Sequence, residues 1–68
     1  MTLEESIARD LPVAKNADNY NRMVKAFSYA DSKEQLAGLA VLYGLDMRYD
    51  RADICLALHT VEIAKGWH

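Results

Sequence analysis

The sequence predicts an all-α fold: a small compact bundle of three main helices, at about residues 17–30, 33–45 and 50–65, with a short helix near residues 3–10 before them. In each main segment, apolar residues recur at the spacing of one helix face. Residues that cap helices stand at the segment ends, and short polar breaks separate the segments. We expect the whole chain, residues 1–68, to form a single domain.

The first helix is expected to be short. Thr2 and Glu5 have the spacing of a capping box, in which each side chain binds the backbone N–H of the other residue. Pro12 lacks an N–H donor and forces the residue before it out of helical geometry. The helix should therefore end near Asp10.

The segment 17–30 has the clearest amphipathic pattern in the chain. Asn16 or Asp18 is the expected N-cap, because both side chains can accept a hydrogen bond from a free N–H of the first turn. The apolar stripe faces away from polar residues such as Arg22 and Lys25. It consists of Tyr20, Met23, Val24 and Phe27.

The segment 33–45 begins with a second capping box, Ser32 and Gln35, and Gly44 is a plausible end for it. Its apolar residues extend well beyond one stripe. The stripe is Leu36, Leu39, Ala40 and Tyr43, widened by Val41, Leu42 and Leu45. Because residues 36–59 are the most apolar part of the chain, we expect them to supply the interior.

Gly38 lies in the middle of this predicted helix, where glycine is about 1 kcal/mol less favourable than alanine. The usual reason for such a glycine is that another backbone passes close by. We expect the neighbour to be the 50–65 helix, at Ala57 or Val61, or the equivalent helix of a second subunit.

The segment 50–65 is capped at both ends. Asp50 can cap its start and Asp53 adds a negative charge in the first turn, while Lys65 and Gly66 suit its end. Its apolar residues should cover most sides of the helix: Ile54, Ala57, Leu58 and Val61, widened by Cys55, Leu56 and Ile63. A buried strand over residues 54–63 is the alternative, but the caps and the length favour a helix.

Composition predicts self-association. Hydrophobic residues make up 51% of a 68-residue chain, more than so small a body can easily bury. Cys55 is the single cysteine, so no disulfide within the chain can compensate. We therefore expect a homo-oligomer, a dimer in the first instance. The lone cysteine and an acidic N-terminus without an export signal indicate a cytoplasmic protein.

DNA binding is the alternative function that the sequence offers. Residues 36–63 could form a divergent helix-turn-helix, since Ala40 and Gly44 have the spacing of its first helix. However, Asp50 and Asp53 stand where the second helix would meet DNA. The net charge is −2 and no basic stripe exists, so nucleic acid is not the expected partner. No uncharged run is long enough to span a membrane.

Neither a metal site nor an active site is expected. Cys55, His59 and Glu62 share one helix face, but structural zinc usually has four ligands and more than one cysteine. The simpler interpretation makes Cys55 a small, inert core residue and His59 a boundary residue. No phosphate-binding glycine loop or nucleophile–base pair is evident, so we expect a non-enzyme without a cofactor.

The aromatic and methionine residues suggest where a partner binds. Tyrosine, tryptophan and methionine are enriched at protein–protein interfaces. Four of them fall at predicted helix ends or in loops: Tyr29, Met47, Tyr49 and Trp67. We therefore expect a regulator, adaptor or inhibitor that binds a partner protein through these residues. Small acidic domains of this kind are common among bacterial and phage regulators, so we expect a protein of that kind.

Overall fold

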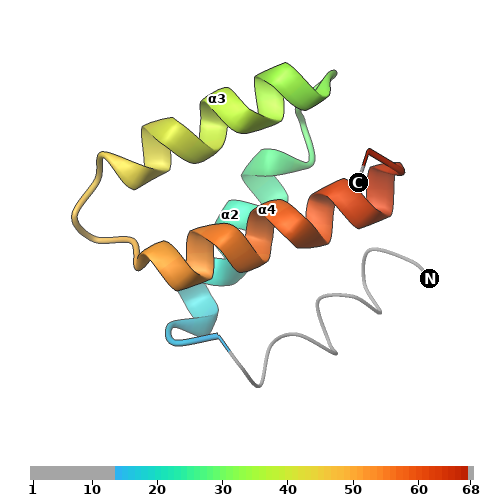
Figure 1. Cartoon of the computed structure of the whole chain (residues 1–68). Coiled ribbons are helices and arrows are strands. Elements are labelled where there is room, and N and C mark those ends of the chain that lie inside the picture. The colour runs from blue at the N-terminus through green and yellow to red at the C-terminus, as the bar shows by residue number, and fades with distance from the viewer. Residues whose placement is uncertain (1–13, 68) are drawn as a thin grey trace.

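The computed structural model describes residues 14–67, which contain three helices and no strand (Figure 1). These are α2 (Ala17–Phe27), α3 (Lys33–Gly44) and α4 (Arg51–Lys65). The all-α prediction and the positions of the three helices are confirmed, and the strand alternative for residues 54–63 is wrong. The short helix predicted near residues 3–10 lies outside the described residues.

The last two helices form an antiparallel hairpin. Figure 1 shows α3 and α4 running in opposite directions on either side of one loop, with α2 behind α4. α2 makes its most extensive contacts with α4 and few with α3. The helix α4 is therefore the central element, and α3 packs mainly against α4 while Tyr43 of α3 also touches Phe27 of α2.

The helix α2 begins as predicted and ends early. The side chain of Asn16 accepts a hydrogen bond from the backbone N–H of Asn19 at 3.0 Å, which makes Asn16 the N-cap. After Phe27 the backbone N–H of Tyr29 donates to a carbonyl only three residues back, at Ala26. The Ser28 hydroxyl also donates to a carbonyl of the last turn, at 2.7 Å. These tight turns end the helix at Phe27 instead of residue 30.

The helix α3 has a modified capping box. The hydroxyl of Ser32 accepts the N–H of Gln35 at 3.2 Å, as predicted. The side chain of Gln35 reaches past Ser32 and accepts the N–H of Asp31 at 2.8 Å. The helix ends at Gly44, but this glycine is not in the left-handed conformation, since only Gly66 has a positive φ among the described residues.

Both ends of α4 are capped as the sequence predicts. The carboxylate of Asp50 accepts the N–H of Ala52 at 2.8 Å. At the other end Gly66 has a φ of 74°, a conformation that favours glycine. The N–H of Trp67 donates to the carbonyl of Glu62 at 2.8 Å, which completes a Schellman motif.

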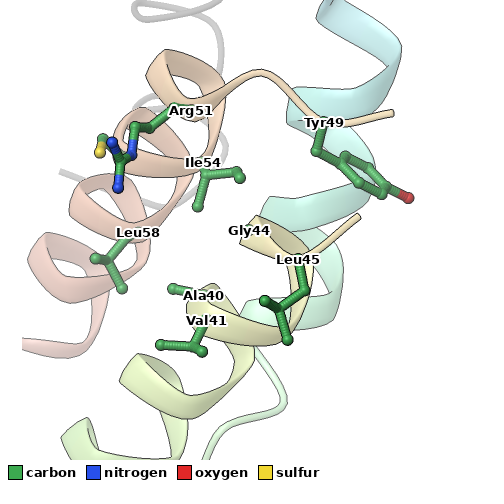
Figure 2. A pocket seen from close by; sticks show the side chains of 9 residues that line it. Ala40, Val41, Gly44, Leu45, Tyr49, Arg51, Ile54 and Leu58 are labelled. Carbon is green, nitrogen blue, oxygen red and sulfur yellow. The ribbon is translucent and has the colours of Figure 1, made fainter. Parts of the chain in front are cut away.

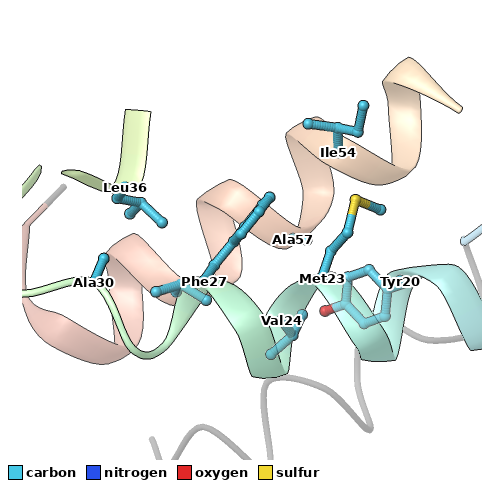
Figure 3. Packing of buried hydrophobic residues seen from close by; sticks show 9 residues of the cluster. Tyr20, Met23, Val24, Phe27, Ala30, Leu36, Ile54 and Ala57 are labelled. Atoms are coloured by element: carbon cyan, nitrogen blue, oxygen red, sulfur yellow. The ribbon is translucent and has the colours of Figure 1, made fainter. Parts of the chain in front are cut away.

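The core lies mainly between α2 and α4 (Figure 3). α2 contributes four buried hydrophobic residues, α4 three and α3 one, with Ala30 between α2 and α3. In Figure 3 the side chains of Met23 and Phe27 point from α2 towards α4. The complete cluster is Tyr20, Met23, Val24, Phe27, Ala30, Leu36, Ile54, Ala57 and Val61. The prediction that residues 36–59 alone supply the interior is wrong.

Two polar contacts join α2 to α4. The carboxylate of Asp53 is 1% exposed and accepts the backbone N–H groups of Lys15 and Asn16, at 2.7 and 2.9 Å. The hydroxyls of Tyr20 and Thr60 lie 2.8 Å apart in a buried hydrogen bond. Asp53 thus supplies an acceptor to the free donors at the start of α2, a role in addition to its place in the first turn of α4.

Two expectations about exposure are wrong. A Cβ atom at Gly38 would meet no neighbouring atom within 4 Å, so neither Ala57 nor Val61 approaches this glycine, and the alternative neighbour, a helix of a second subunit, stays a prediction. The helix α4 is also more open than its apolar residues suggest, because Cys55 is exposed and Leu58 is only half-buried. The close approach fails because α3 meets α4 through Leu36 and its neighbours on the opposite side of the helix from Gly38.

Candidate interaction surface on α3

The helix α3 directs large apolar side chains into solvent. Val41 is 64% exposed, Leu42 63% and Leu45 77%, and Met47 in the following loop is 99% exposed. The core side of the helix is taken by Leu36, which is buried, together with three partly buried residues that pack against the core. A helix presents only part of its circumference to one neighbour, so the remaining apolar residues point outward. We call the α3 face the set Ala37, Gly38, Val41, Leu42, Leu45 and Met47.

A hollow of about 420 Å³ lies between α3 and α4 on one side of this face (Figure 2). The small residues Ala40 and Gly44 line it on α3, and Figure 2 shows Val41 and Leu58 on opposite sides of it. Its full lining is Ala40, Val41, Gly44, Leu45, Tyr49, Arg51, Ile54, Cys55 and Leu58. The hollow is apolar apart from the borders that Arg51 and Tyr49 provide.

A second, shallower hollow of about 620 Å³ lies between α3 and the end of α2. Gly38 and Leu42 border it on α3, and Tyr29 borders it on the other side. Its full lining is Ala26, Tyr29, Ala30, Gln35, Gly38, Leu39 and Leu42. The α3 face is therefore an apolar ridge with a hollow along each side.

Charges occur only at the two ends of α3. Residues 35–45 carry no ionisable side chain except Tyr43, whereas Lys33 and Glu34 precede them and Asp46 and Arg48 follow. The guanidinium of Arg48 donates to both carboxylate oxygens of Asp46, at 2.7 to 3.1 Å. These side-chain hydrogen bonds, and then the backbone N–H of Arg48, lower the pKa of Asp46 from 3.8 to about 2.

Of the four predicted interface residues, Met47 belongs to the α3 face, and Tyr29 and Tyr49 lie beside its two hollows. Tyr29 is 77% exposed beside the second hollow, and Met47 extends from the loop. Tyr49 is half-buried: its ring packs edge-on against Tyr43, with centroids 4.8 Å apart, and it lines the first hollow. Trp67 lines neither hollow and lies beneath the ammonium of Lys65, 5.2 Å from the ring centroid.

The centre of the surface was not predicted from the sequence. Val41, Leu42 and Leu45 were assigned to a widened core stripe, yet all three are more exposed than buried. The signal that could have found them is the spread of apolar residues around almost the whole of α3. A helix that is covered along one side only cannot bury such a set.

The described part of the chain gives little support for metal binding or DNA binding. No group of three or more His, Cys, Asp or Glu side chains in residues 14–67 could hold a metal ion. In the first three turns of α4 the exposed side chains are Arg51, Ala52, Cys55 and His59, with one permanent cation among them. The buried Asp53 does not face outward, which removes one carboxylate from the surface that DNA would meet. One guanidinium still provides little attraction for phosphates.

No protein-family model, curated protein or solved structure matches the chain. None of the helices in residues 14–67 combines the length and the apolar character needed to cross a bilayer.

Proposed function

We propose that the chain is a non-enzymatic protein-interaction module, a regulator, adaptor or inhibitor that acts by covering part of a partner protein. The observation that carries this proposal is the exposure of four aliphatic side chains, Val41, Leu42, Leu45 and Met47, on and beside one helix. Together they expose an area on the order of 500 Å², comparable to the apolar patches that mark binding surfaces.

The surroundings of the α3 face support binding to protein. Tyr29 and Tyr49 border the two hollows, and aromatic residues next to apolar pockets are typical of interface hot spots. Fully burying an exposed leucine contributes about 1.5–3 kcal/mol, so Leu42 and Leu45 could supply much of the binding free energy. Within this proposal the module acts in the cytoplasm, where its single, unpaired cysteine would remain reduced.

The experiment compares two variants that each add one carboxylate to an exposed helix position. Val41→Glu lies in the α3 face, and Asn21→Glu lies on the polar side of α2. Glutamate is at least as good a helix former as valine or asparagine, so both variants should fold. Immobilised wild-type protein should capture partner molecules from a native lysate. Val41→Glu should lose them and Asn21→Glu should keep them.

Equal capture by wild-type protein and Val41→Glu would contradict the proposal. A mobility-shift assay on random duplex DNA at low salt tests the helix-turn-helix alternative on residues 36–63. Retardation that weakens steeply as salt is added would favour that alternative over protein binding.

A further inference from the structure

We propose that the occupant of the α3 face is a second copy of this chain, with the two α3 helices packed antiparallel about a two-fold axis near Val41. This inference rests on the proposed function, because it names the partner of the same surface. In such an interface each copy contributes the same residues, so the face must complement itself. Three properties of the α3 face meet that requirement.

The first property is shape. The N-terminal half of the face is formed by small residues, Ala37 and Gly38, and the C-terminal half by Leu42 and Leu45. An antiparallel pair that crosses near Val41 places Leu45 of each copy over Ala37 and Gly38 of the other. Large side chains then fall into hollows, as in close helix packing. A parallel pair would instead place leucine against leucine and leave the small residues uncovered.

The second property is the empty space over Gly38. Apart from the adjacent backbone of its own helix, no atom of residues 14–67 lies within 4 Å of the position that a Cβ would occupy, so the described fold of one copy gives no steric reason for glycine there. Glycine is a poor residue for a helix interior. A leucine of a second copy seated in the adjoining hollow, which Gly38 and Leu42 line, would use this space.

The third property is charge. Glu34 is exposed in the first turn of α3, and the Asp46–Arg48 pair follows its last turn. An antiparallel pair brings Glu34 of one copy towards the Asp46–Arg48 ion pair of the other, whose two charges balance, and it aligns the two helix dipoles favourably. A parallel pair would set Glu34 beside its own counterpart. The uncharged stretch between these ends suits the centre of an interface.

The buried area is adequate for a dimer of modest affinity. Each copy offers on the order of 500 Å² of aliphatic side chain, so two copies bury about 1,000 Å² before the borders of the hollows are counted. This is the lower end of the range for specific complexes. We therefore expect association at micromolar concentration.

Cysteine cross-linking tests the position of the axis. Residues on a two-fold axis meet their own counterparts, so Val41→Cys in a Cys55→Ser background should form a disulfide-linked dimer under mild oxidation. Asn21→Cys in the same background is the matched control, because residue 21 is exposed on α2. We expect at least a tenfold faster cross-linking at position 41 than at position 21, and adding Leu45→Glu should remove the difference.

Sedimentation equilibrium of the unmodified chain provides the second measurement. A dimer mass at micromolar concentration, reduced to a monomer mass by Val41→Glu, supports the inference. A monomer mass throughout, or equal cross-linking at positions 41 and 21, overturns it. If the chain is monomeric while partner capture still depends on Val41, the inference fails and the proposed function stands. If Val41→Glu changes neither association nor capture, the proposed function fails too.

Discussion

The helices α2 and α3 show opposite relations between composition and burial. α3 is the more apolar of the two, yet it buries one side chain, Leu36. α2 contains charged and amide residues such as Asn21 and Lys25, yet it buries four. The difference lies in arrangement: in α2 the apolar residues form one stripe, while in α3 they surround the helix. Segregation of apolar residues, more than their number, decides which helix enters the core.

The helices α2 and α3 also differ in how they are attached to α4. α2 is joined to α4 by the core and by the hydrogen bonds of Asp53 and Tyr20. α3 is joined to α4 mainly through one face, with the ion pair between Lys33 and Glu62 reaching 4.0 Å. Such a long ion pair, with an exposed lysine, adds little. The apolar residues of α2 therefore stabilise the fold, and the outward residues of α3 remain available for binding.

The largest expected difference is between truncating a side chain of α2 and truncating one of α3, measured as the loss in the free energy of unfolding. Phe27→Ala removes a ring that is fully buried, and should cost about 3–5 kcal/mol, enough to unfold a domain of this size. Leu42→Ala, on the exposed side of α3, should change the free energy of unfolding by less than about 1 kcal/mol. Urea titration followed by circular dichroism measures both. Equal losses would mean that composition governs stability after all.

Removing the hydrogen bonds that Asp53 accepts from the segment before α2 should have the next largest effect on the free energy of unfolding. Asp53→Ala leaves two backbone N–H groups at the start of α2 without their acceptor, and should cost about 3 kcal/mol. The control is Asp50→Ala, which removes an exposed N-cap and should cost about 1 kcal/mol. The difference between the two midpoints in urea is the test. If Asp50→Ala is the more harmful change, the buried carboxylate does not hold α2 in place.

Gly38→Ala tests whether the side of α3 that carries Gly38 is open to solvent in one chain. In dilute solution it should raise the free energy of unfolding by about 1 kcal/mol, because the helix gains propensity and no atom obstructs the new methyl group. Gly66→Ala should lower it, since the φ of 74° at that position disfavours alanine. Thermal melts at low concentration compare them. Destabilisation by Gly38→Ala would show that its surroundings are closed within one chain.

The smallest effect concerns the charged end of the α3 face. The hydrogen bonds from Arg48 hold the pKa of Asp46 at about 2, below its ordinary 3.8. The resulting stabilisation is present above the ordinary value and is lost as the pH falls through about 2. NMR titration should show the pKa of Asp46 return towards 3.8 in Arg48→Gln. A pKa that does not move would place Arg48 elsewhere in solution.

Local signals in the sequence were sufficient to predict the three helices and most of their caps. Asn16, Ser32, Asp50 and Gly66 each form the cap expected of them, since capping depends on neighbours a few residues away. The stripe of α2 was also read correctly, because four residues at helical spacing can face only one side. The end of α2 was missed because the tight turn after Phe27 left no clear sequence signal.

The candidate surface could be predicted only in part. Tyr29, Met47 and Tyr49 were predicted from residue type and position at helix ends, and the structure places them in or beside the α3 face, while their role in binding stays a prediction. Val41 and Leu45 were missed because the sequence does not state how many neighbours a helix has. The same uncertainty produced the wrong expectation for Gly38, since a glycine beside a packed neighbour and one beside open space look alike in sequence.

Native-state hydrogen exchange tests whether α2 and α4 form the stable unit while α3 is held less firmly. It is best measured on Val41→Glu, which should remain monomeric if the proposed dimer forms through α3. The slowest-exchanging amides of α2 and α4 should have an opening free energy equal to that of global unfolding, and those of α3 a lower one. If the amides of α3 exchange as slowly as those of α2, the two helices are equal parts of one core and α3 is not held less firmly.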